Sequence, residues 1–104
     1  KVFDVTWSGD RKPGEDGKLP AVGNTVNVAN ASWTNTIGSS ELATVWTDPE
    51  FNPEHRAFYY ARVLEIPTPR WSTHDAFRFG IDIPEGAPTS TQERAYTSPI
   101  WYNP

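Results

Sequence analysis

Short runs of alternating apolar and polar residues mark the chain, and this is the pattern of half-buried β-strands. Arg56–Ile66, "RAFYYARVLEI", is the strongest run, because large side chains occupy both alternating faces. Val2–Trp7 alternates as well, with Phe3, Val5 and Trp7 on one fully apolar face. We therefore expect both runs to be strands, and the longer one to be central in its sheet.

Three further runs are less regular. Asn24–Asn35 alternates until about Asn30, where the register slips and a bulge is expected. In the C-terminal strand candidate, Glu93–Pro104, Pro99 predicts an edge or bulged position. Ser39–Trp46 fits a helical stripe and a strand face equally well; its shortness favours a strand, and the helix stays open.

A proline-rich stretch, "LEIPTPRWSTHDAF", follows the strongest strand candidate. Pro67 is expected to end that strand, because proline donates no ladder hydrogen bond. Beyond it the sequence allows either a turn of helix from Ser72 or a short strand over Ala76–Ile81. Earlier in the chain, Asp16-Gly17 is a favourable turn pair.

Several short strands separated by turn signals predict an all-β fold. Ten prolines and seven glycines disfavour long helices. We expect residues 1–104 to form a single β domain: an antiparallel β-sandwich, immunoglobulin-like in general architecture, with long loops and at most one short helix. Five Trp, four Tyr and five Phe are expected to supply most of its core.

The charge pattern excludes some partners. The net charge is −4, with acidic and basic residues interspersed, which argues against nucleic acid and against an anionic membrane surface. No apolar run approaches the roughly 20 residues that cross a bilayer. Cysteine is absent, so a disulfide, a thiolate nucleophile and a Cys-ligated zinc are all excluded.

No catalytic set and no metal site emerge from the residue pattern. His55 and His74 lie in different loop-like segments, without H-x-H or H-E-x-x-H spacing. Glu65 and Glu93 would become paired carboxylates only if their strands were neighbours; the plainer interpretation is that they are solvated or matched with nearby arginines. We expect no catalytic residue and no cofactor in this chain.

A possible docking or ligand surface begins at Arg70-Trp71. The plain interpretation is a guanidinium stacked on a ring at a strand corner, and the sharper one is a clamp for phosphate or carboxylate. Exposed rings also suggest carbohydrate binding, although most rings in proteins are core or interface. The candidate docking residues are Arg70, Trp71, His74, Asp75, Arg78 and Trp101.

Several runs together carry a family resemblance. "FDVTWSGDRKPGEDGKLPAVGNTV", "NTIGSSELATVWTDPEFNP", "YYARVLEIPTPRW" and "QERAYTSPIWY" resemble, in order, the C-terminal end of the bacterial domain-of-unknown-function 3604 family. Members of that family look like metal-dependent hydrolases of the PHP (polymerase and histidinol phosphatase) type, with a His-rich catalytic domain followed by a β-rich region. None of its metal motifs matches a position of this chain.

The resemblance implies a non-catalytic accessory role. The chain would be the C-terminal β-region of a larger hydrolase that uses a divalent metal, and its partner would be the catalytic domain of that parent, which it supports or caps. Many members look exported, which suggests a periplasmic parent. The alternatives are a carbohydrate or small-ligand module using exposed Trp and Tyr, and an uncharacterised independent enzyme. An exposed sheet edge would also invite self-association.

Overall fold

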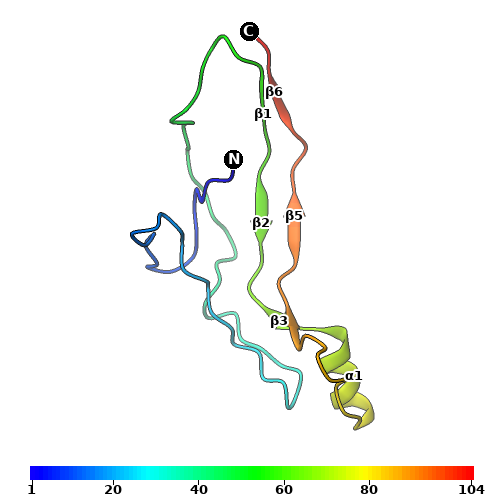
Figure 1. The fold of residues 1–104 in the computed structure, drawn as a ribbon. Helices are drawn as coiled ribbons and strands as arrows, with labels where there is room; N and C mark the ends of the chain where they lie inside the picture. Colours follow the sequence, from blue (N-terminus) through cyan, green and yellow to red (C-terminus); the bar gives the residue numbers. More distant parts are fainter.

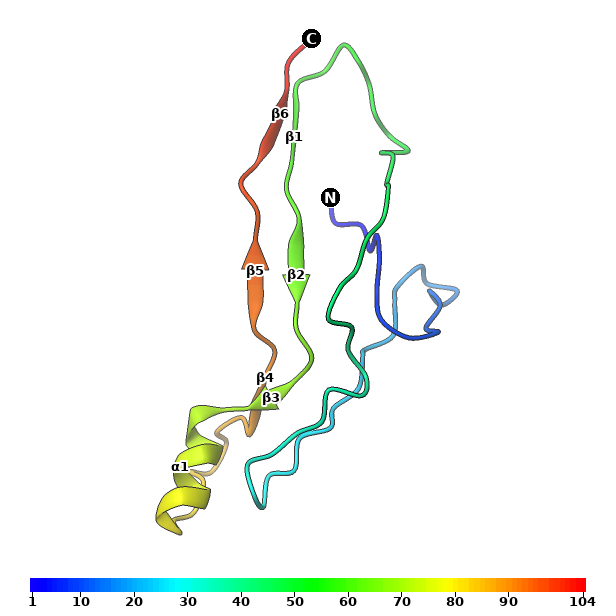
Figure 2. The ribbon, with the colours of Figure 1, turned by 180° about the vertical axis from the view of Figure 1, so that it is seen from behind.

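One long antiparallel ribbon dominates the computed structural model, which describes residues 1–104 (Figure 1). Strand β1 pairs with β6, β2 with β5 and β3 with β4, all antiparallel. The ribbon has two arms, the first formed by residues 57–69 and the second by residues 90–102. Figure 2 shows both arms from behind, joined at one end through a short helix. The elements are β1 (Ala57–Tyr59), β2 (Arg62–Leu64), β3 (Thr68–Pro69), α1 (Trp71–Phe79), β4 (Ser90–Thr91), β5 (Arg94–Tyr96) and β6 (Ile100–Tyr102).

Two bulges of opposite sense divide the ribbon. Between the pairs Tyr59↔Ile100 and Arg62↔Tyr96, two residues of the first arm face three of the second, Thr97 to Pro99. Between Leu64↔Arg94 and Thr68↔Thr91, three residues of the first arm, 65–67, face two of the second. Each bulge contains a proline, where the missing N–H would otherwise leave a gap in the ladder. The bulged position expected for Pro99 is confirmed.

Side chains replace the ladder bonds that the bulges interrupt. The Ala61 N–H donates to Thr97 Oγ1 at 2.9 Å, and Gln92 Nε2 donates to the Glu65 carbonyl at 2.8 Å. The backbone therefore stays hydrogen-bonded through both irregularities. The strand ends before Pro67, as we expected, since β2 stops at Leu64; the pairing of the two arms resumes at Thr68 in β3.

Helix α1 forms where the sequence left helix and strand open. Gly80 adopts the left-handed conformation (φ 63°), and this glycine terminates the helix. Arg78 in the last turn is favourable at the negative end of the helix dipole. The helical alternative from Ser72 is confirmed, with a start one residue earlier, and the strand alternative over Ala76–Ile81 is wrong.

The N-terminal half contains none of the named strands. Val2–Trp7 and Ser39–Trp46 have no regular secondary structure, so the expected strands there are wrong. In Asn24–Asn35 a single isolated bridge joins Asn27 to Ser32. Where a register slip was expected, the chain instead turns back on itself between Asn27 and Ser32. Residues 1–56 form an extended segment without regular secondary structure, which we call the N-terminal lead. It lies beside the first arm (Figure 1).

Aromatic contacts hold this lead against one face of the ribbon. Trp46 contacts Phe3 and Tyr59, with ring centroids 5.0 and 6.3 Å apart. The Tyr59 hydroxyl donates to Asp48 at 2.8 Å. The pKa of Tyr59 is raised, most of all by this hydrogen bond to Asp48. Partial loss of water and the negative charge of the carboxylate raise it further. Further along, Phe51 and Tyr102 meet edge to face, with centroids 4.9 Å apart.

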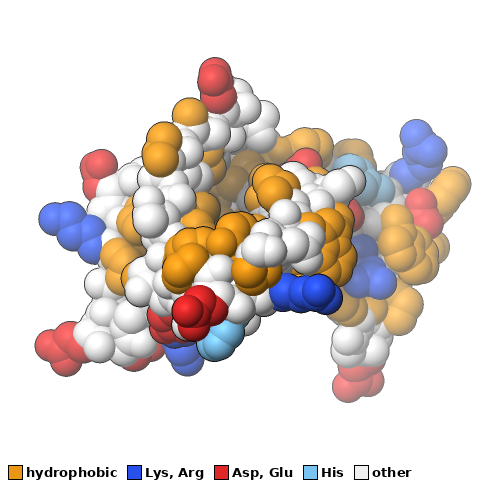
Figure 3. Space-filling model, turned by 90° about the horizontal axis from the view of Figure 1, so that it is seen from above, with side chains coloured by type: hydrophobic (Ala, Val, Ile, Leu, Met, Phe, Trp, Pro, Cys, Tyr) orange, Lys and Arg blue, Asp and Glu red, His pale blue; other side chains and the backbone are white.

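The molecule nevertheless has almost no core. Its extents are 60 × 27 × 25 Å and its radius of gyration is 18.2 Å, whereas a compact chain of this length has about 13 Å. Only four residues are buried: Ala31, Pro69, Ser72 and Thr73. The expected aromatic core is therefore wrong, and Figure 3 shows apolar side chains reaching the surface.

The ribbon also forms no second layer. The three paired pieces follow one another along the same two arms, and no other sheet exists in the chain. What stands from the expected fold is a set of small antiparallel strands with one short helix. The sandwich is not formed by these residues. No helix is both long and apolar enough to cross a membrane.

Candidate docking site at the ribbon corner

The corner between β3 and α1 is the best-anchored part of the molecule. The Thr89 carbonyl accepts two hydrogen bonds there, from the Arg70 N–H at 3.0 Å and from Thr73 Oγ1 at 2.7 Å. Thr73 is fully buried, and Ser72 and Pro69 beside it are buried as well. These contacts fix the first turn of α1 against the loop that leads into β4.

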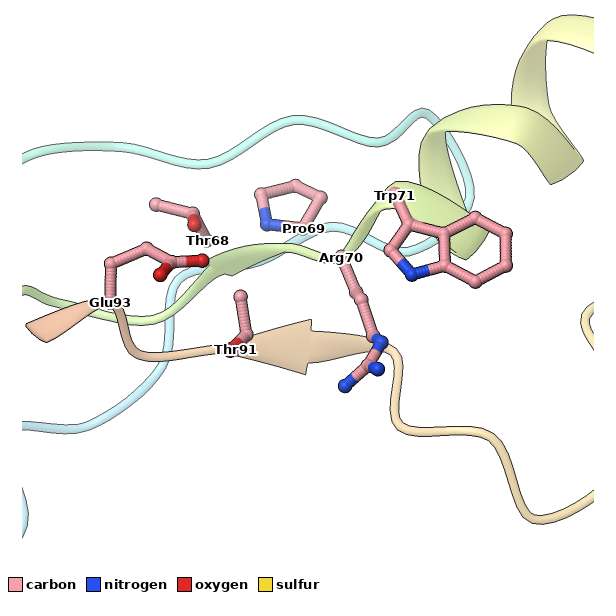
Figure 4. Close-up of a pocket in the computed structure, with 6 residues that line it drawn as sticks. All are labelled: Thr68, Pro69, Arg70, Trp71, Thr91 and Glu93. Carbon is pink, nitrogen blue, oxygen red and sulfur yellow. The ribbon is translucent and has the colours of Figure 1, made fainter.

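Trp71 projects from this anchored corner into solvent. Its side chain is 67% exposed, while Arg70 before it is half-buried. A shallow hollow lies beside them, lined by Thr68, Pro69, Arg70, Trp71, Thr91 and Glu93 (Figure 4). The guanidinium of Arg70 does not point at the Glu93 carboxylate, and no ion pair joins them. The corner thus presents an exposed ring beside a half-buried arginine on an anchored base.

Helix α1 extends this surface. Trp71, His74 and Arg78 are separated by three and four residues, so they share one side of the helix. His74 and Arg78 are exposed, and Asp75 is half-buried toward the neighbouring face. The candidate residues of the corner and helix are therefore brought together, as a surface with the exposed Arg78 and His74 beside one large ring.

Trp101 is not part of this surface. It lies on β6, at the end of the ribbon opposite to α1 (Figure 1). Trp71 and Trp101 therefore do not line one site within the chain. Trp101 instead contacts Phe58, with ring centroids 5.2 Å apart, on a surface that the sequence did not reveal.

The acidic, histidine and hydroxyl side chains are placed as follows. No group of three or more His, Cys, Asp or Glu side chains converges as metal ligands would, so this chain does not fit the divalent metal of the family resemblance. The hydroxyls of Ser72 and Thr73 bond to the carbonyls of Pro88 and Thr89, at 3.5 and 2.7 Å. These hydroxyls are therefore structural, and neither is placed as a nucleophile.

Glu65 and Glu93 are neighbours after all, because β2 and β5 pair. The Glu65 N–H donates to the Glu93 carbonyl at 3.0 Å, which places the two residues opposite each other. Both are exposed, and neither forms an ion pair with Arg62 or Arg94. Like charges directly opposite one another destabilise a ladder slightly. Of the two expected possibilities, the solvated one is therefore confirmed, and the match with the arginines is not formed.

The structure thus defines the class of the chain: an antiparallel ribbon with a helical corner, whose apolar surface is left uncovered. The model of the DUF3604 family, described as a protein of unknown function, matches residues 1–104, and the chain belongs to this family. No curated protein and no solved structure matches the chain.

Proposed function

We propose that the chain is a non-catalytic C-terminal part of a PHP-like metal-dependent hydrolase, which supports or caps the catalytic domain. The observation that carries this proposal is the missing core. The chain exposes 8532 Å², whereas a compact protein of 11.7 kDa exposes about 5,900 Å². The excess is roughly 2,600 Å², which is about three times what one partner contributes to a standard interface.

This magnitude favours a large partner body over a second copy. A symmetric dimer with one standard interface would cover about 800 Å² of each chain and leave most of the excess in water. Nineteen large apolar side chains are exposed, and they are spread over the N-terminal lead, both arms and the helix. A body that surrounds the ribbon on several sides covers them, and the catalytic domain of the parent hydrolase is such a body.

Within the assembled parent, the corner surface is the proposed contact with the catalytic domain. It comprises Arg70, Trp71, His74, Asp75 and Arg78, and its anchored base lets it dock at low cost in side-chain and backbone entropy. The remaining strands of a β-sandwich would come from the parent and pack on the ribbon. The metal and the catalytic groups would belong to the catalytic domain. The periplasmic setting is part of the same proposal.

The test begins with the reading frame that precedes Lys1. The proposal requires it to encode a catalytic domain with H-x-H metal ligands, and a start codon directly before Lys1 would refute it. The parent and a version lacking residues 1–104 are then compared. We expect the shortened version to lose soluble yield and Mn²⁺-dependent phosphoesterase activity, and the separate chain to have no such activity.

The carbohydrate-binding alternative stays open because exposed rings are present. Trp71 and Trp101 are 67% and 66% exposed, and a sugar that stacked on either ring would change its fluorescence. A panel of glycans titrated against the chain, with Trp71→Ala and Trp101→Ala as separate variants, identifies which ring responds. A response lost in one variant would favour a binding module over the accessory role.

A further inference from the structure

A second exposed surface lies on the ribbon itself, away from the corner. Phe58 stacks beside Tyr60 and contacts Trp101, and Tyr60 contacts Tyr96; the centroid distances are 6.3, 5.2 and 6.2 Å. We call these four rings the aromatic ladder. Each is more than half exposed, at 55–66%. None contacts a ring of the N-terminal lead, which packs on the other face through Tyr59.

The Pro99 bulge builds this ladder. Tyr96 and Trp101 are five residues apart, so in a regular strand they would point to opposite faces. The extra residue between them restores the face, because Trp101 lies opposite Phe58 and Tyr96 lies opposite Arg62. Phe58 and Arg62 lie on the same face of the first arm, because they are four residues apart. The rings of Tyr96 and Trp101, which lie opposite them, therefore share this face. The bulge thus gathers four rings that the spacing alone would separate.

The same face has a cationic end. Arg62 and Leu64 continue the alternation of the first arm, and Arg94 lies opposite Leu64. Both guanidiniums are exposed and have no hydrogen-bond or ion-pair partner in the chain, where the single ion pair joins Lys1 to Glu50. Among the strand residues that share this face, from Phe58 to Leu64 and from Arg94 to Trp101, none carries a carboxylate or an amide. Sugar hydroxyls would find few acceptors here, so the surface suits protein better than carbohydrate.

We infer that the aromatic ladder packs on an apolar surface of the parent hydrolase, and that carboxylates border this surface where it meets Arg62 and Arg94. This inference rests on the proposed function and adds a second contact to it. The rings expose roughly 500 Å² together, which is large for one patch on a small chain. With the arginines, the area approaches the roughly 800 Å² that one side of a stable interface contributes. Because Arg62 and Arg94 have no partner in the chain, they favour an opposing surface with carboxylates along its border, which we call the acidic rim.

The experiment uses the longer polypeptide, with a photo-crosslinking amino acid introduced at position 58 or position 101. Equal amounts of ¹⁴N- and ¹⁵N-labelled protein are mixed before irradiation, and the crosslinked peptides are identified by mass spectrometry. We expect both positions to crosslink to one apolar segment of the same chain, outside residues 1–104 and containing Asp or Glu. Crosslinks between the two isotopic forms, or no crosslinks from either position, would overturn the inference.

Charge reversal tests the acidic rim. In the longer polypeptide, Arg62→Glu should lower the hydrogen-exchange protection of β1 and β2 about ten-fold, because like charges across a contact are strongly unfavourable. Lys12→Glu changes the net charge equally on an exposed loop and should leave that protection unchanged. Reversing the carboxylate in the crosslinked segment should restore the Arg62→Glu variant.

Equal effects of the Arg62→Glu and Lys12→Glu substitutions would refute the rim. These outcomes are distinct from a failure of the proposed function. A catalytic domain can precede Lys1 while the ladder remains unprotected, and then only this inference fails. The absence of a catalytic domain refutes the proposed function at the level of the gene, before any crosslinking.

Discussion

Replacing Thr73 by valine tests whether the corner is held by the contacts described. Thr73 is the one fully buried side chain, and its hydroxyl donates to the Thr89 carbonyl at 2.7 Å. Valine keeps the shape and removes this hydrogen bond. Thr89 still accepts from the Arg70 N–H at 3.0 Å, so no buried carbonyl is left unsatisfied. We therefore expect a cost of about 1 kcal/mol, the usual net value of one hydrogen bond.

Hydrogen exchange of the α1 amides measures this cost locally. About 1 kcal/mol corresponds to a roughly five-fold rise in the population of the open helix. Thr73→Ala removes a methyl group as well, which adds about 0.8 kcal/mol and should bring the loss of protection to roughly twenty-fold. The amides of β1 are the internal control. Unchanged protection in the valine variant, or equal loss in β1 and α1, would refute the anchoring role of Thr73.

Three further outcomes follow. The chain alone should self-associate through its uncovered surface and sheet edges, so a light-scattering mass of 11.7 kDa at every concentration would contradict this expectation. Spectrophotometric titration should show a raised pKa for Tyr59, which falls toward the ordinary value in Asp48→Ala because its hydrogen bond and charge are removed. Because protonated Tyr59 is favoured in the folded state, this contact stabilises the fold below the ordinary tyrosine pKa and is lost as the pH rises through the raised value. Gly80→Ala should cost about 1 kcal/mol of α1 stability by circular dichroism, since its φ is 63°, whereas no loss would mean that the helix does not need this end.

The sequence predicted the arms of the ribbon better than anything else. Alternation in Arg56–Ile66 located β1 and β2, although the expected central position is wrong, because each strand pairs on one side only. Pro99 was rightly placed at a bulge. Local signals sufficed there, because a strand's two faces follow from its period. The helix at Trp71–Phe79 was left open, since Phe77, Phe79 and Ile81 alternate as in a strand, while Ser72 could begin a helix. Gly80 at its end was the signal that could have decided it.

The core and the aromatic ladder could not be predicted in the same way. Alternation shows which side chains share a face, but it does not show what covers that face. Phe3 and Trp7 were expected to be buried and are only half-buried, while Val5 is exposed. The joint face of Tyr96 and Trp101 was hidden by their odd spacing, which predicts opposite faces in any regular strand.

The two bulges have a consequence for how the family can vary in length. The arms 57–69 and 90–102 are equally long, and the offset introduced near Pro99 is cancelled near Pro67. One residue inserted into either arm alone would reach the helical corner as an uncancelled shift and would turn β3 over relative to β4. Insertions and deletions in relatives should therefore occur in pairs, one in each arm, or be confined to the loops outside the ribbon.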